Sequence, residues 1–406
     1  TGGDGMYAVA DPRNSKTVYA GSQFGFYSRI ERDRGKRTMI TPRRDIGEPA
    51  LRWNWRTPVL LSKHNPDIVY MAAQKVFRSF NKGDAWEVIS GDLTKNVKQG
   101  DVPFSTIASL AESPLKFGLL YAGTDDGNLW ISKNSGGSWE LITNGLPKDK
   151  WVSSVYPSTH QEGTVFVSLN GYRTDDLRTY LFMSSDYGAT WTSLKGNLPD
   201  AVANVIIQDP VNANLLYCGL DNGTYVSLDK GKTWQFFNGM LNVSSYDMIV
   251  HPRDNELVVG THGRSVFVAD IKPLQALRDV NKGIQAFANE GLRYSERWGE
   301  KQAEWAKPYQ PQADILYYCG KAGDVLVEIY DEKKALVRKT KAEGSVGFHT
   351  FTWDVKIAEA APAAPAKKGK SVAPTLQGTT KYAGKGKYTV KFINGTETSE
   401  TTVEIK

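Results

Sequence analysis

The segment from Glu112 to Trp139 reads ESPLKFGLLYAGTDDGNLWISKNSGGSW and decides the fold of this chain. It contains a Pro turn, an apolar strand with Tyr and Gly, a Gly turn, a second strand and a Gly-rich hairpin that ends in Trp. Short apolar runs separated by Gly, Asp and Asn turns predict antiparallel strands. A sheet of this size cannot bury both of its faces alone, so other parts of the chain must cover it.

The same phrase recurs along the first two thirds of the chain. Its marker prolines stand 42 to 54 residues apart: Pro12, Pro66, Pro114, Pro157, Pro210 and Pro252. A period in this range is typical of propellers and solenoids. We therefore expect six similar supersecondary units before about residue 272.

A second motif, Ser-x-Asp/Asn-x-Gly-x-x-Trp, follows the Tyr-Gly strand in four copies. These four segments, here called the Ser-to-Trp turns, are Ser79–Trp86, Ser132–Trp139, Ser184–Trp191 and Ser227–Trp234. A short Asp or Asn side chain can bond backbone amides of its own turn, Gly supplies a positive φ, and Trp can pack under the hairpin. We interpret the motif as structural and not as a catalytic or calcium-binding carboxylate.

Each copy is interpreted as one four-stranded blade, which makes residues 1–272 an all-β, multi-bladed β-propeller. The first copy lacks a Ser-to-Trp turn, and the last ends after RSVFVAD at Asp270. Six recognisable blades could close a ring. A seven-bladed or larger ring fits the pattern equally well.

The last third differs in pattern. Residues 273–312 are expected to form a helical connector and linker, with apolar residues at Leu274, Leu277 and Ile284. Residues 313–406 contain short alternating strands that predict a β-sandwich. Residues 358–375 are an Ala/Pro/Lys segment with too little apolar content to pack, and we expect a solvated loop there.

Composition excludes several function classes. Lys and Arg number 50 against 44 Asp and Glu, a net charge of +6 that is spread too evenly for a nucleic-acid binder. No apolar run approaches the roughly 18 residues of a membrane span. Cys218 and Cys319 fall in different predicted domains, so no disulfide is expected. The five His show no metal-ligand spacing, and no phosphate- or dinucleotide-binding Gly motif is present, so we expect neither metal nor cofactor.

Four Ser-to-Trp turns resemble the Asp-boxes of bacterial neuraminidase-type repeats. The strands at Phe351–Asp354 and Gly386–Val390 resemble an Ig-like module of the flagellar-hook-scaffold type. Together with the segments GTDDG, LNGYR and GTHGRS, they make the chain similar to large secreted proteins of Bacteroidota, which are described as sortilin-like or as glycosyl hydrolases. The resemblance implies export to the periplasm, cell surface or medium. It also implies further N-terminal blades, in keeping with a first residue that is Thr1, but no settled activity.

The strand order predicts where a site would lie. The turns after the Tyr-Gly strands and the loops that lead into the inner strands share one face, here called the mouth, where propeller ligands generally bind. Ligand-binding candidates at the mouth are Arg52, Trp53, Trp55, Arg56, Tyr172, Arg173, His262 and Arg264. Charged and aromatic groups from several blades suit a sugar, a peptide segment or a chain terminus. The main hypothesis is thus an exported scaffold that binds a protein or a polysaccharide, as a free protein or as a subunit of a larger surface complex.

The alternative is a carbohydrate-active hydrolase. Most glycosidases need two carboxylates about 5 to 10 Å apart. The candidates at the mouth are Asp101, Asp125, Asp126 and Asp221, and none stands in a recognisable catalytic motif. Asp126-Gly127 is also an ordinary turn-forming pair.

Overall fold

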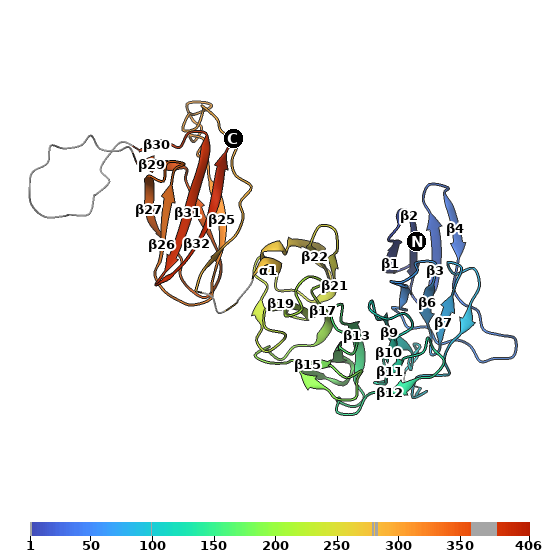
Figure 1. The fold of residues 1–406 in the computed structure, drawn as a ribbon. Coiled ribbons are helices and arrows are strands. Elements are labelled where there is room, and N and C mark those ends of the chain that lie inside the picture. Colours follow the sequence, from blue (N-terminus) through green and yellow to red (C-terminus); the bar gives the residue numbers. More distant parts are fainter. Residues whose placement is uncertain (1, 99, 278–279, 281–282, 359–379) are drawn as a thin grey trace, which may run out of the picture. The chain divides into compact units, whose positions relative to one another are not determined.

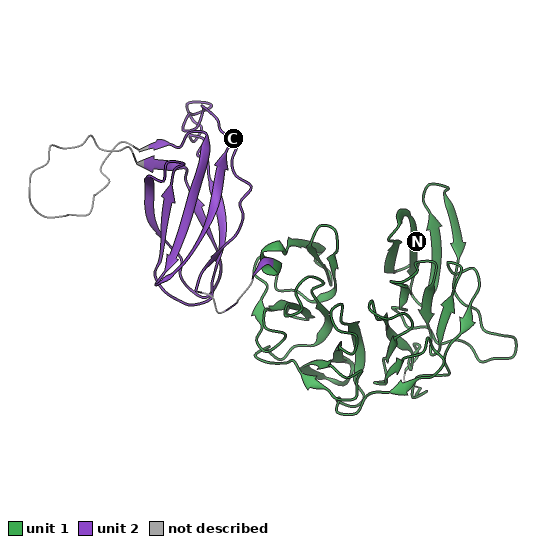
Figure 2. Ribbon diagram, viewed as in Figure 1, with its two compact units in different colours: residues 1–275 green, residues 276–406 purple. Residues whose placement is uncertain are grey.

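A computed structural model of the chain describes residues 2–98, 100–277, 280, 283–358 and 380–406. The chain divides into two compact units, Thr1–Gln275 and Ala276–Lys406 (Figure 2). Each unit is built almost entirely from antiparallel strands (Figure 1). The proposed loop at 358–375 lies outside the described residues apart from residue 358.

The first unit is a multi-bladed β-propeller of six sheets, so the predicted fold class is confirmed. The first two sheets are β1–β4 (Gly5–Asp11, Asn14–Ser22, Phe26–Glu31, Lys36–Met39) and β5–β8 (Val59–Leu61, Val69–Ala72, Val76–Ser79, Glu87–Val88). The next two are β9–β12 (Ile107–Glu112, Leu120–Thr124, Leu129–Ser132, Glu140–Leu141) and β13–β16 (Trp151–Pro157, Val165–Gly171, Asp176–Ser184, Thr192–Ser193). The last two are β17–β20 (Ala203–Gln208, Leu216–Leu220, Gly223–Ser227, Gln235–Phe236) and the three-stranded β21–β23 (Ser245–His251, Glu256–Thr261, Val266–Asp270).

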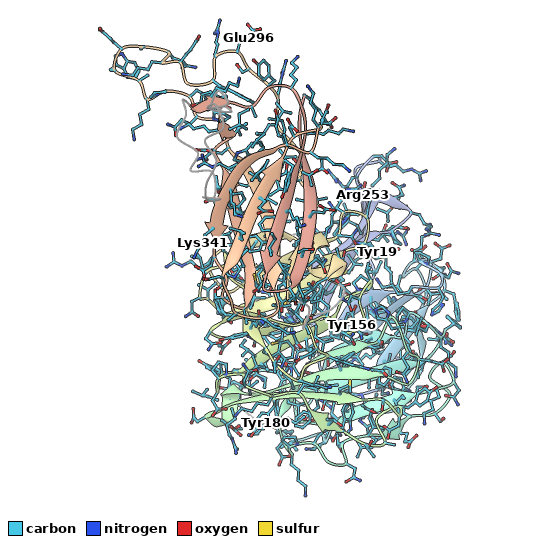
Figure 3. The ribbon with its side chains drawn as sticks, turned by 60° about the vertical axis from the view of Figure 1, so that its left-hand side comes forward. Tyr19, Tyr156, Tyr180, Arg253, Glu296 and Lys341 are labelled. Atoms are coloured by element: carbon cyan, nitrogen blue, oxygen red, sulfur yellow. The ribbon has the colours of Figure 1, made fainter. Side chains whose placement is uncertain are left out.

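Apolar side chains fill the space between neighbouring sheets. The fifth sheet presents Val205, Ile207 and Tyr217, which pack against Met248 and Leu257 of the sixth. Polar contacts join the inner strands as well: Tyr156 of β13 donates its hydroxyl to the Gln208 carbonyl at 3.0 Å (Figure 3). The stability of each blade therefore depends on its neighbours.

The four Ser-to-Trp turns share one hydrogen-bond pattern. In the third of them, Ser184 Oγ accepts the Gly188 amide at 2.8 Å and Asp186 Oδ1 accepts the Thr190 amide at 2.9 Å. Gly188 has φ +87°, and a Cβ there would lie 2.5 Å from Ile142 Cδ1 of the preceding blade. Glycine is required at this position both by its backbone conformation and by this close approach.

The Trp of each of these turns binds the blade before its own. The indole N–H donates at 2.7 to 2.8 Å to a carbonyl one residue past the preceding fourth strand. The pairs are Trp86 with Ile40, Trp139 with Ile89, Trp191 with Ile142, and Trp234 with Leu194. These bonds, here called the indole latches, tie each outer strand to the next blade.

The second unit contains two larger sheets, with strand orders β24-β25-β28 and β27-β26-β31-β32, and the pair β29-β30. Trp353, Tyr317 and Phe392 lie in its buried core. Its strands are β24–β28 (Gln285–Ala286, Ala313–Cys319, Val325–Tyr330, Leu336–Ala342, Gly347–Trp353) and β29–β32 (Lys356–Ala358, Thr380–Tyr382, Gly386–Asn394, Glu397–Ile405).

The connector differs from the expected helix. Among the described residues of the connector, helical structure is confined to α1 (Lys272–Ala276). Ile284 is fully buried in the core of the second unit, and β24 pairs with β25, so tertiary packing outweighs the local apolar spacing. Trp298 belongs to the same core, which places much of the expected linker within the second unit.

Both cysteines are buried and unpaired. No helix among the described residues is long and apolar enough to span a bilayer.

Candidate functional site

Backbone hydrogen bonds bring the predicted mouth turns and inner-strand loops to the same end of the propeller. The Asp125 amide donates to the Thr106 carbonyl at 3.0 Å, the Asp221 amide to Val202 at 3.0 Å, and the His262 amide to Ser244 at 2.9 Å. In each case the turn after a second strand bonds the loop just before the inner strand of its own blade. The mouth is thus built by local pairing within each blade, which repeats around the ring.

One cavity at this end, here called the mouth pocket, has a volume of about 200 Å³. It lies where the third and fourth sheets meet. Its polar and aromatic lining includes Lys95, Asp125, Asp126, Trp151, Asn170 and Arg173. Three of these six residues were among the catalytic or ligand-binding candidates from the sequence.

Arg173 is the most available cation of the mouth pocket. It stands in the 3-10 turn η1 (Tyr172–Thr174), and its guanidinium lies 4.6 Å from the centre of the Trp151 ring. It is exposed, and within the described part of the chain no acidic side chain forms a direct ion pair with it, although its charge opposes the rise in the pKa of the Asp125 carboxyl. Stacking on an indole holds a guanidinium in place while its N–H groups stay free to bind a carboxylate.

The pocket is lined by three carboxylates, of which Asp149 forms an ion pair with Lys95 at 2.6 Å and the two candidates from the sequence are hydrogen-bonded. Asp125 accepts the Thr106 amide at 2.8 Å and the Thr106 hydroxyl at 2.7 Å, while Asp126 accepts the Lys95 amide at 2.8 Å and the Thr124 hydroxyl. Both are buried. Burial raises the pKa of the Asp125 carboxyl, and the bonds from Thr106 partly oppose that rise. The Asp125 and Asp126 carboxylates thus hold the loops in place, in keeping with the interpretation of Asp126-Gly127 as a turn-forming pair.

The other two carboxylate candidates lie away from the pocket. Asp221 Oδ1 accepts hydrogen bonds from Asn204 at 2.9 Å and from Ser244 at 2.8 Å. Asp101 is exposed in the loop that leads to β9. The four acids therefore do not line one cavity.

A second cluster lies in the central channel. Arg56 donates to the Tyr7 hydroxyl at 2.6 Å, and its guanidinium lies 4.8 Å from the Tyr7 ring centre and 5.0 Å from that of Tyr246. Together with Asp247 and Asn204, these groups surround a cavity of about 130 Å³. Asp247 is reached by solvent, yet the protein around the channel raises the pKa of its carboxyl, and Arg56 opposes the rise.

The channel changes character along its length. Towards the Pro turns it widens into an apolar cavity of about 490 Å³, lined by inner-strand residues such as Leu60, Leu110, Val155 and Ile249. Marker prolines 114, 157, 210 and 252 also line it. The mouth end is polar and the opposite end is apolar.

The remaining candidates divide into packed and exposed groups. Arg52 bonds Asp92 at 2.7 Å and the Ser105 carbonyl at 3.1 Å, and Trp53 stacks on Phe77, so both serve the scaffold. The exposed candidates are Trp55, which contacts Phe24 edge to face, and Tyr172, His262 and Arg264.

Trp151 and Lys95 were missed from the sequence, as were Tyr7 and Asp247 in the channel. Trp151 begins an inner strand, so the same rule that selected the loop before β5 could have selected it. Lys95 lies in the same loop before β9 as the candidate Asp101, but its ion pair with Asp149 at 2.6 Å joins residues of different blades and could not be predicted from local spacing.

No family model matches the chain. Sortilin from Rattus norvegicus is 28% identical over 153 residues, which cover 36% of this chain and 17% of that protein. A xyloglucanase from Hypocrea jecorina is 28% identical over 177 residues, 40% of this chain and 21% of that protein. The matched regions thus span only about a fifth of these relatives.

Among solved structures, the GH74 xyloglucanase from Xanthomonas campestris superposes with a TM-score of 0.51 at 15% identity, covering 65% of this chain and 44% of that one. The chain carries a β-propeller, and parts of it are similar in sequence to sortilin and to xyloglucanases. The likeness to the solved structure concerns the fold, which hosts both binding proteins and enzymes.

Proposed function

We propose that this chain is an exported binding propeller whose mouth holds an acidic segment of a partner protein. The observation that carries the proposal is the Arg173–Trp151 pair, an aromatic-backed cation without a direct ion pair in the described chain. The neighbouring carboxylates of Asp125 and Asp126 are occupied by hydrogen bonds. The pocket therefore offers recognition groups and no free pair of carboxylates for acid–base work.

The ligand we infer carries one carboxylate per pocket. A cavity of about 200 Å³ accommodates roughly one residue, so an Asp or Glu side chain or a chain terminus fits its size. A guanidinium can bind a carboxylate through two parallel N–H bonds. Exposed Tyr172 beside Arg173 can add apolar contact to the next residue of the segment.

The resemblance to secreted, Ig-carrying proteins motivates the cellular setting. We propose the periplasm or cell surface as the location, with the Ser-to-Trp turns acting as Asp-boxes and the second unit as an Ig-like spacer or docking module. In this setting the chain acts as a component of a surface assembly. Mild-detergent purification of the endogenous protein is expected to retain its partner subunits.

The test of the site is charge reversal with a matched control. Arg173→Glu is expected to weaken binding to an immobilised library of acidic peptides at least tenfold, with the melting temperature nearly unchanged. Arg253→Glu is the control, because Arg253 is 81% exposed on a Pro turn away from the mouth (Figure 3). If both variants bind the peptides as tightly as the wild type, the mouth pocket does not bind the acidic segment and the proposal is wrong.

A carbohydrate-active hydrolase is the second candidate, and the similarity to xyloglucanases favours it. It predicts release of reducing ends from xyloglucan or a related polysaccharide. Asp221→Ala should then abolish release while the fold persists, because Asp221 is exposed and bonds only side chains. A polysaccharide panel that gives no release would exclude this activity.

A further inference from the structure

The sixth sheet is the only one of the propeller, within the described residues, that lacks a fourth strand. In the third blade β12 pairs with β11, and the second, fourth and fifth blades have equivalent short strands. The sixth sheet ends at β23. Its outer edge is therefore a row of backbone groups of the kind that other blades use to bind a strand.

The register shows which groups are free. The Thr261 amide bonds the Ser265 carbonyl at 3.2 Å, and the Ile271 amide bonds the Asn255 carbonyl at 3.1 Å. Because alternate residues of an antiparallel strand point their backbone groups to the same side, Val266 and Val268 direct theirs away from β22. No described residue bonds those groups.

The side chains at this edge are uncovered too. Val266 pairs with Gly260 as Leu129 pairs with Gly123 in the third blade, so the two strands can be compared position by position. Leu129 and Ile131 are 0% and 1% exposed under the next blade, whereas Val266 and Val268 are 60% and 58% exposed.

Nothing in the strand protects this edge. Free strand edges usually carry a Lys, a Pro or a bulge that discourages pairing. The stretch Val266-Phe267-Val268 has none of these and is rich in β-forming residues. The chain itself turns away after Asp270, where fully buried Ile271 leads into α1.

We propose that β23 binds an extended strand of a partner protein, which completes the sixth sheet. The incoming strand runs antiparallel to β23 in the register of β12 on β11, where the Ile142 amide bonds the Leu129 carbonyl at 2.9 Å. Its amide opposite Val266 donates to the Val266 carbonyl, and aliphatic side chains cover Val266 and Val268. Backbone pairing supplies affinity in this mode and the side chains supply specificity.

Exposed charges at the two ends of β23 indicate which residues the antiparallel partner strand carries at its own ends. An antiparallel strand begins beside Asp270 and ends towards exposed Arg264. A basic residue at its start and an acidic residue at its end are therefore favoured. This site is separate from the mouth pocket and does not depend on the function proposed for it.

The test uses hydrogen exchange of the whole chain with a synthetic peptide as probe. The peptide follows residues 138–144, which contain the β12 strand, with Lys in place of Ser138, Val in place of Glu140 and Glu in place of Asn144, and it reads KWVLITE. We expect the amides of Val266 and Val268 to exchange as free amides in the chain alone and at least tenfold more slowly with saturating peptide. Phe267 and Ala269, which face β22, should be protected throughout.

Two controls each remove one hydrogen bond of the proposed pairing, one from the chain and one from the peptide. Val268→Pro lacks the outward N–H but keeps the bonds to β22, so it should abolish the effect of the peptide while circular dichroism stays unchanged. A peptide N-methylated at the position of Ile142 should fail on the wild-type chain, which keeps the test valid if the Pro variant does not fold.

Three results would overturn the proposal. Protection of Val266 and Val268 in the dilute chain alone would mean that the edge is already covered by the chain. Protection that grows with protein concentration and vanishes in Val268→Pro would mean that a second copy is the occupant. Unchanged exchange at millimolar peptide would mean that the edge does not bind strands.

Discussion

The indole latches predict a specific loss of stability when Trp234 is replaced by Phe. Trp234 is 3% exposed and donates its indole N–H to the Leu194 carbonyl at 2.8 Å, and Leu194 is itself 4% exposed. Phe keeps an aromatic ring but removes the donor. Removing the donor leaves the buried Leu194 carbonyl unpaired, which costs about 1 to 3 kcal/mol, and because both residues are almost fully buried we expect the upper part of this range, about 2 to 3 kcal/mol.

Calorimetry of the whole chain tests this value. For a unit of this size about 1 kcal/mol shifts the melting temperature by roughly 2 to 4 °C, so the propeller transition should fall by about 4 to 12 °C. Trp305→Phe is the matched control, because Trp305 is 89% exposed in the second unit. If both variants melt within about 1 °C of the wild type, the latch does not stabilise the propeller and the reasoning is wrong.

Two further predictions concern other groups. Hydrogen bonds from Thr190 and Ser184 lower the pKa of Asp186 from 3.8 to about 2, so its stabilising contribution is complete above pH 4 and is lost as the pH falls towards 2. Urea unfolding between pH 2 and 6 should show this loss in the wild type and a flatter profile in Asp186→Asn; identical profiles would refute it. Cys218 and Cys319 are both 0% exposed, and burial raises the pKa of each thiol, so a thiol reagent should label neither in the native chain and both after unfolding. Rapid labelling of either under native conditions would contradict the packing described for them.

The blades could be predicted from the sequence because each depends on local spacing. The hydrogen bonds of each Ser-to-Trp turn lie within eight residues. A motif this short can be recognised in a single copy, and its four copies establish the repeat. The same logic located the mouth, because strand order alone decides which turns share an end.

The site itself could be predicted only in part. Arg173 was found because it follows a repeat strand, but its stacking partner Trp151 is the first residue of the inner strand β13, and no spacing rule links the two. The channel pair Arg56 and Tyr7 lies 49 residues apart in neighbouring blades. Contacts between blades depend on how the sheets pack, and a single sequence does not contain that information.

The indole latches also bear on how such a chain can change in length over evolution. Donor and acceptor lie one repeat apart, so the second, third and fourth blades each carry one Trp for the blade before and one carbonyl for the blade after. Duplicating or deleting a whole repeat leaves each remaining donor with an acceptor of the same kind, whereas a cut within a repeat leaves one of them unmatched. The number of blades can thus change by whole repeats without new contacts having to arise. The series of latches ends at the fifth blade, because no described Trp of the sixth blade donates to a carbonyl after the outer strand Gln235–Phe236.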